Sequence, residues 1–312
     1  MSIFDKRTNY KPFEYHEPIV FTEAMNKTFW VHSEVDFTAD IQDYKVNLTD
    51  IERTIFTRSI LSIAQTEVVV KPFWSDLYKH FPKPEINGMG VTFAESEFRH
   101  SEAYSRILEV NGLEKEFELA LQSKPFRDYN YFVTSYMASE DIASKSTFFS
   151  LIIENGSLFS KFSNVLAFTR FKGIMKNTSN IIAWTSSDED IHANGGIWII
   201  NQLRKEGYLK ITQQEVKEMC NEYIQVESNL LDWIYEYGEL DWFSKDDMLN
   251  FIKVRIDEAL IKAGFDKVFN TKSPKMEWFN EEIYANSLAD FFAVRPTDYT
   301  KHDKSITAND LF

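Results

Sequence analysis

The length, composition and charge of the chain exclude several classes of protein. Its 312 residues carry a formal net charge of −14 without any basic cluster, which argues against a nucleic-acid or anionic-membrane surface, because both need Lys and Arg to neutralise phosphate. The N-terminus lacks the apolar segment of a secretory signal, and the longest apolar stretches, such as residues 196–200, are far too short to span a bilayer. We therefore expect a soluble, cytoplasmic protein.

Long segments without glycine or proline carry apolar residues at helical spacing. The first of them begins at Thr49, which resembles a capping signal, and the second ends near Asn111 and Gly112, a typical C-terminal cap. The expected helices span residues 49–71, 91–110, 127–153, 157–174, 176–206, 213–237 and 246–264.

The breaks between these helices are marked by few residues. Pro82, Pro84 and Gly88 interrupt the chain after the first helix, and Gly156 marks a break or kink between two later ones. The sequence shows no alternating runs bounded by hairpin turns, no glycine-rich phosphate loop and no GxSxG elbow. We therefore expect an all-α helical bundle.

The chain changes character near its end. Residues 1–290 are expected to form a single helical domain, and residues 291–312 are polar, contain Pro296 and end on the apolar pair Leu311-Phe312. This composition predicts a flexible C-terminal segment with an adhesive end.

One short motif, Glu-x-x-His, occurs twice inside the expected helices. Glu97 and His100 form one copy, and Glu189 and His192 form the other. Residues three apart on a helix share a face, so each pair can reach one metal ion, and two such pairs are half of a dinuclear carboxylate site. The alternative is that these are surface pairs, or core histidines with a glutamate nearby by chance.

The other half of such a site is one glutamate from each of two further helices. Glu67 is followed by three valines and Glu154 follows a strongly apolar run, so both should be buried, and a buried charge needs a partner. Each precedes a Glu-x-x-His by a similar separation, which suits a pair of antiparallel helices. The alternative is a buried ion pair, for which Lys71 is available one turn after Glu67.

In this order the residues resemble the ligand series of class I ribonucleotide reductase small subunits. The resemblance runs from about residue 20 to the end of the chain and implies a ferritin-like bundle with two metal ions in its core. The metal ligands that it implies are Glu67, Glu97, His100, Glu154, Glu189 and His192.

Further positions match the path by which this family exports an oxidising equivalent. Trp30 resembles the family's buried tryptophan, and Asp188 resembles the aspartate that links it to a metal-bound histidine. Tyr104 matches the radical-bearing tyrosine of many members, and Tyr299 matches the tyrosine of the C-terminal tail that docks on the large subunit. The resemblance implies a homodimer that is active only with that large subunit.

Three departures indicate a subclass. The first ligand is Glu67 where many members have Asp, Thr185 lies near Tyr104 and one turn before Glu189, and Lys71 would lie near the metals. These features look closer to the dimanganese subclass, class Id, which stores the oxidant on the metals and not on a tyrosine. Di-iron and mixed manganese–iron centres suit the same ligands.

The single cysteine, Cys220, fits the family. It excludes an intrachain disulfide and a multi-thiolate metal site, and is expected to be a small, semi-buried residue. Ribonucleotide reduction needs several thiols, so the chemistry on the nucleotide would belong to the large subunit. Two other functions remain open: a ferritin-like dimetal oxidase or oxygenase, and a non-enzymatic metal-binding protein.

Overall fold

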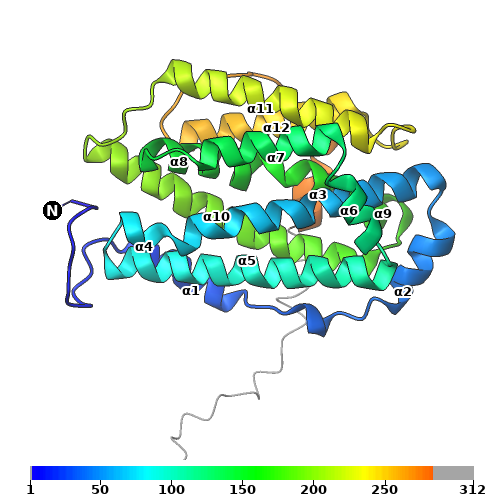
Figure 1. Cartoon of the computed structure of the whole chain (residues 1–312), viewed down its shortest axis with the longest axis horizontal. Coiled ribbons are helices and arrows are strands. Elements are labelled where there is room, and N and C mark those ends of the chain that lie inside the picture. The colour runs from blue at the N-terminus through cyan, green and yellow to red at the C-terminus, as the bar shows by residue number, and fades with distance from the viewer. Residues whose placement is uncertain (1, 284–312) are drawn as a thin grey trace, which may run out of the picture.

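The computed structural model describes residues 2–283, and these residues form an all-helical bundle (Figure 1). Among them the only β-type pairing is an isolated bridge between Leu240 and Phe243. The elements that precede α3 or lie outside the ligand-bearing bundle are α1 (Glu17–Lys27), α2 (Thr38–Gln42), α4 (Leu77–His80), α6 (Glu114–Ala120), the 3₁₀-helices η1 (His32–Glu34) and η4 (Pro274–Met276) and the short π-helix η2 (Asp43–Asn47). The elements of the bundle are α3 (Asp50–Ser75), α5 (Pro84–Asn111), α7 (Lys124–Met137), α8 (Ile142–Phe148), η3 (Phe149–Ser157), α9 (Phe159–Lys172), α10 (Lys176–Lys205), α11 (Gln213–Ile234) and α12 (Lys245–Lys262).

Helices α3 and α5 lie side by side (Figure 1), and local sequence explains where α3 begins and where α5 ends. Thr49 caps α3 in a capping box with Glu52, as expected. Gly112 ends α5 with φ +68°, a left-handed conformation that glycine adopts without a steric penalty.

Three boundaries differ from the prediction. Helix α5 begins at Pro84, because proline lacks only an N–H that the first turn does not use, and Gly88 lies inside the helix. Helix α3 continues through Pro72 to Ser75, four residues past its expected end. The expected helix over residues 127–153 is interrupted after Met137, and a new helix starts where Asp141 accepts the backbone N–H groups of Ala143 and Ser144.

The segment after α8 is a π-helix, η3, in which all nine residues are buried. Gly156 lies inside it and does not mark a break, which corrects the expectation. Helix α10 packs closely on η3 and α5 because it carries two glycines. A Cβ atom on Gly196 would lie 2.0 Å from the Ser150 Oγ atom, and one on Gly195 would lie 2.7 Å from the Phe93 ring.

The helices surround one continuous hydrophobic core, which buries more than half of the aromatic side chains of residues 2–283. Within residues 2–283, no helix combines the length and the low charge needed to cross a bilayer. Cys220 is fully buried in this core, as a small apolar residue would be.

Candidate metal centre

Six buried side chains from four adjacent elements converge in the centre of the bundle. Helices α3 and α5, the π-helix η3 and helix α10 contribute them, and none is more than 1% exposed. Their ligand atoms fall into two groups, and within each group all atoms lie within 4.8 Å of one another. The first group is Glu67, Glu97, His100 and Glu189, and the second is Glu97, Glu154, Glu189 and His192.

Glu97 and Glu189 belong to both groups, so each would hold both of two neighbouring metal ions. Glu67 and His100 complete one position, and Glu154 and His192 complete the other. Carboxylate and imidazole ligands suit manganese and iron, and one Glu-x-x-His pair from each of two helices is the pattern of dinuclear centres in helical bundles. The structure therefore brings together all six residues that the sequence singled out.

Unpaired polar atoms provide a test of whether these residues fit metal ions. Both carboxylate oxygens of Glu67 and of Glu97, the Nδ1 atom of His100 and one oxygen of Glu189 are buried without a hydrogen bond from the described residues. The His100 Nδ1 atom lies 3.2 Å from Glu189 Oε1 and 3.4 Å from Glu97 Oε2. Leaving so many buried polar atoms unpaired would be costly, and two cations among them would satisfy all of them. The residues fit a dinuclear metal centre.

The pKa values of the six groups show how strongly they interact. Burial raises the pKa of Glu67 and of Glu154 well above the usual range for a carboxyl group. Burial acts in the same direction on Glu97 and Glu189, but His192 and His100 outweigh it and lower the pKa of both. The two carboxylates shared by both groups are therefore the ones whose pKa is lowered.

The two histidines take up the corresponding positive charge. Burial alone would lower the pKa of His192, but Glu189 and Glu97 raise it to about 9. In the same way Glu67 and the other facing carboxylates raise the pKa of His100 despite its burial. The facing carboxylates therefore favour positive charge at the centre of the cluster, which is the charge that metal ions carry.

Behind His100, away from the ligand cluster, lies a short chain of hydrogen bonds. The Asp188 Oδ2 atom lies 3.1 Å from the Nε2 atom of His100 and accepts the indole N–H of Trp30 at 2.9 Å. The Trp30 and His100 rings are stacked 5.7 Å apart, at an angle of 14°. Arg99 donates to the Trp30 carbonyl oxygen and lies 3.7 Å from Asp188.

Tyr104 is fully buried beside the cluster, one turn after His100 on α5. Its hydroxyl donates to the Thr185 hydroxyl at 3.0 Å, and burial raises its pKa well above the usual value. A carboxylate would be a proton acceptor for this phenol, but the Thr185 hydroxyl is not a base at neutral pH.

Lys71 does not pair with the ligand carboxylates. Its side chain is half-buried, and its ammonium lies 5.6 Å from the centre of the exposed Phe98 ring. No described carboxylate lies within 4.0 Å of it, so the structure does not show the ion pair with Glu67 that the sequence left open. Tyr299 lies outside the described residues.

Two residues next to the ligands were not singled out from the sequence. Trp74 donates its indole N–H to Glu154 at 2.9 Å, and the Ser96 hydroxyl lies 2.8 Å from the Nε2 atom of His192. Trp74 lies on the last turn of α3, beyond Pro72, where the helix was expected to have ended. The position of Ser96 directly before Glu97 was the only available signal for it.

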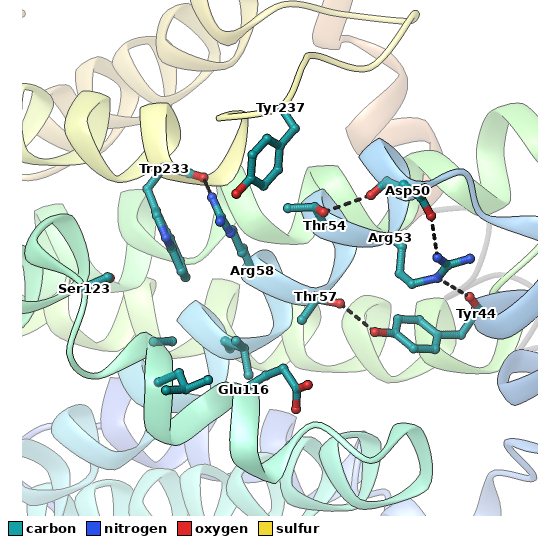
Figure 2. Close-up of a pocket in the computed structure, with 13 residues that line it drawn as sticks. Tyr44, Asp50, Arg53, Thr54, Thr57, Arg58, Glu116, Ser123, Trp233 and Tyr237 are labelled. Atoms are coloured by element: carbon teal, nitrogen blue, oxygen red, sulfur yellow. Dashed lines mark hydrogen bonds and ion pairs between the residues drawn. The ribbon is translucent and has the colours of Figure 1, made fainter.

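A separate pocket of about 440 Å³ is lined by residues of α3, α6 and α11, and none of the six ligand residues lines it (Figure 2). Arg53 donates there to backbone carbonyls and to Asp50, and Arg58 lies over the Trp233 and Tyr237 rings. Both cations already have partners, so these contacts connect α3 to the chain around it.

The sequence matches the family model "Ribonucleotide reductase, small chain" over residues 7–275. Among curated proteins, the chain is 26% identical to a probable ribonucleoside-diphosphate reductase small subunit of Invertebrate iridescent virus 3, over 95% of this chain and 85% of that protein. It is 22% identical to the ribonucleoside-diphosphate reductase subunit beta of Chlamydia pneumoniae, over 86% and 83% of the two chains.

Solved structures resemble the fold. A putative class I ribonucleotide reductase from Bacillus halodurans superposes with a TM-score of 0.79 at 18% identity, covering 86% of this chain and all of that one. The dimanganese(II)-NrdF of Streptococcus sanguinis superposes with a TM-score of 0.76 at 14% identity, covering 90% and 99% of the two chains. The expected ferritin-like bundle and the expected oxidoreductase family are confirmed, and this chain belongs to the ribonucleotide reductase small chain family.

Proposed function

We propose that this chain is the radical-generating small subunit of a ribonucleoside-diphosphate reductase, and that it exports an oxidising equivalent from its dinuclear centre to a large subunit. The observation that carries the proposal is the hydrogen-bonded chain from His100 through Asp188 to Trp30, because it connects the ligand cluster to a tryptophan that is itself only 3% exposed. A metal store has no use for such a connection.

Each residue of this chain of contacts has a defined task. When bound and oxidised by dioxygen or an oxidant derived from it, the two metals would supply the one-electron oxidising capacity. Asp188 fixes the ring of His100 and accepts the indole proton of Trp30, so that an electron can leave the indole while its proton stays within hydrogen-bond distance. Arg99 lies 3.7 Å from Asp188 and donates to the Trp30 carbonyl oxygen, so it ties the two residues of this contact together.

The oxidant is proposed to reside on the metals, as in the dimanganese subclass, class Id, and not on Tyr104. The support is the environment of the phenol: its proton points at the neutral Thr185 hydroxyl, so no base stands ready to take it when the ring is oxidised. Manganese is the proposed metal; iron fits the same ligands.

The experiment that tests the metal and the oxidant is metal analysis combined with electron paramagnetic resonance on the active protein. Two manganese ions per chain and a multiline manganese signal are expected. A narrow tyrosyl signal that disappears in Tyr104→Phe would overturn the assignment of the oxidant. Hundreds of metal ions per assembly would instead indicate a storage protein.

Residues 1–290 are proposed to act as one ferritin-like domain, and residues 291–312 as the tail that docks on the large subunit through the terminal Leu311-Phe312, with Tyr299 relaying the oxidising equivalent. Truncation before residue 295 should abolish turnover with the large subunit and leave the metal content unchanged. A dimetal oxidase acting on a small substrate would be indifferent to this truncation. Size measurement by light scattering should show the proposed homodimer.

Lys71 is proposed to attract an anionic oxidant towards the centre, because its ammonium has no carboxylate partner within 4.0 Å among the described residues and follows Glu67 by one turn. Lys71→Met should slow activation by superoxide and leave metal binding intact. An activation rate equal to that of the unmodified protein would contradict this role.

A further inference from the structure

The two histidine ligands differ in what holds the outer side of their rings. His100 directs its Nε2 atom at the carboxylate of Asp188, whereas His192 directs its Nε2 atom at the hydroxyl of Ser96, 2.8 Å away. Ser96 is completely buried on α5, directly before Glu97. One histidine therefore faces a carboxylate and the other a hydroxyl, and this difference affects how strongly each metal position binds.

The direction of the Ser96–His192 hydrogen bond follows from counting protons. A serine hydroxyl has one proton, and that of Ser96 is donated to the Phe93 carbonyl oxygen at 2.8 Å. The Ser96 oxygen can therefore only accept from His192, so the Nε2 atom of His192 carries a proton. The Nδ1 atom is then the one that faces the ligand cluster, and it lies 3.1 Å from both Glu97 and Glu189.

The acceptor also sets how strongly each imidazole binds a cation. Asp188 is a carboxylate, and an anionic acceptor on the outer N–H makes the inner nitrogen a better donor to a metal. Ser96 is neutral, and its one proton is donated to the Phe93 carbonyl oxygen, so it increases the metal affinity of His192 less than Asp188 increases that of His100. The glutamate that belongs to only one metal position also differs between the two positions. Glu154 accepts the Trp74 N–H, which leaves its carboxylate less available to a metal, whereas neither oxygen of Glu67 accepts a hydrogen bond.

We propose that Ser96 is a positioning residue that fixes His192 as an Nδ1 ligand, and that the position formed by Glu154 and His192 binds metal more weakly than the one formed by Glu67 and His100. This inference rests on the proposed dinuclear function. The centre then fills in order, first beside His100 and then beside His192.

The test is a titration of metal-free protein with Mn(II), followed by the resonance signal of the free ion. The unmodified protein should show two binding events of unequal affinity. Ser96→Ala should weaken the second event by about 10–100-fold and leave the first within about twofold, as expected for loss of a group that orients a ligand. Ser96→Thr keeps the hydroxyl and should restore the second event.

Ser163→Ala is the matched control. Ser163 is also fully buried and donates to a carbonyl within its own helix at 2.8 Å, but it does not contact a ligand. It should bind both ions as the unmodified protein does, and thermal unfolding of both metal-free alanine variants shows that any difference is not a failure to fold. Anomalous diffraction from crystals with one equivalent of Mn(II) should place that ion beside His100.

The outcomes separate this inference from the function on which it rests. If the unmodified protein does not bind two manganese ions, the proposed dinuclear function is wrong. If it binds two but Ser96→Ala binds them equally well, or if the first ion lies beside His192, only the inference is overturned.

Discussion

A buried ion pair that the metal centre does not use gives a sharp prediction about stability. Lys161 on α9 and Glu227 on α11 are 1% and 0% exposed. The Lys161 ammonium lies 2.7 Å from both Glu227 oxygens and donates to the Ser157 carbonyl at 2.7 Å, and Ser160 donates to Glu227 at 2.5 Å. The pair joins two helices through the interior of the bundle.

Lys161→Met keeps the length of the side chain and removes its charge. It leaves the Glu227 carboxylate buried with Ser160 as its hydrogen-bond donor, and removing one partner of a buried pair costs about 3–5 kcal/mol. Against a total stability of about 5–15 kcal/mol, that is a large fraction. The midpoint of unfolding should fall accordingly.

The double replacement Lys161→Met with Glu227→Leu should recover most of this loss. Burial lowers the pKa of Lys161 although Glu227 opposes the shift, as expected of a buried pair in which desolvation of the ammonium is costly. Replacing both charges by apolar groups of similar volume is then close to neutral. The remaining cost, about 1 kcal/mol, comes from the unpaired Ser160 hydroxyl.

Urea unfolding of the metal-free proteins measures these values, provided that circular dichroism and tryptophan fluorescence give coincident transitions. The single variant should be less stable than the double variant by about 2–4 kcal/mol. A single variant that loses less than about 1 kcal/mol, or a double variant as unstable as the single one, would refute the reasoning.

Three further predictions concern other buried groups. Trp74→Phe removes the N–H donated to Glu154 and should weaken Mn(II) binding about tenfold or more, whereas unchanged affinity would contradict a role for this bond. Because the pKa of His192 is about 9 and its Nδ1 atom must be free to bind metal, Mn(II) uptake at about pH 7 should release protons and tighten as pH rises; calorimetry in buffers of different ionisation enthalpy measures this. Burial raises the pKa of Cys220 to about 12, so a thiol reagent should label it only after unfolding, and rapid labelling of the folded protein would show that the thiol is accessible.

The long helices could be predicted from the sequence because apolar spacing and end signals agree. Thr49 and Gly112 mark their helix ends as the pattern indicated. Proline was the main source of error: Pro72 lies inside α3 and Pro84 begins α5, so the same residue type has opposite meanings that depend on position in the helix. The break before Asp141 was missed because the apolar pattern resumes immediately after it.

The ligand residues could be found from the sequence because carboxylates within apolar helix faces, or paired with histidines, are unlikely to be ordinary surface charges. The residues that orient the ligands carry no such mark. Ser96 and Trp74 are ordinary core residues in composition, and only the packing of α5 on α10 and of α3 on η3 brings them to His192 and Glu154. Asp188 was identified through the family resemblance, since an acid beside a glutamate is common on helix surfaces.

The π-helix that carries Glu154 has a consequence for how this protein tolerates changes in length. A π-turn holds one more residue than the α-turn it replaces, and each residue of an α-helix turns the chain by about 100°. Deleting a single residue other than Glu154 within 149–157 should favour a regular α-helix there and rotate Glu154 away from His192, although every amino acid that contacts the centre would still be present. The position of Glu154 therefore depends on the number of residues in this segment as much as on which residues they are. We expect the segment to tolerate insertions and deletions less well than substitutions.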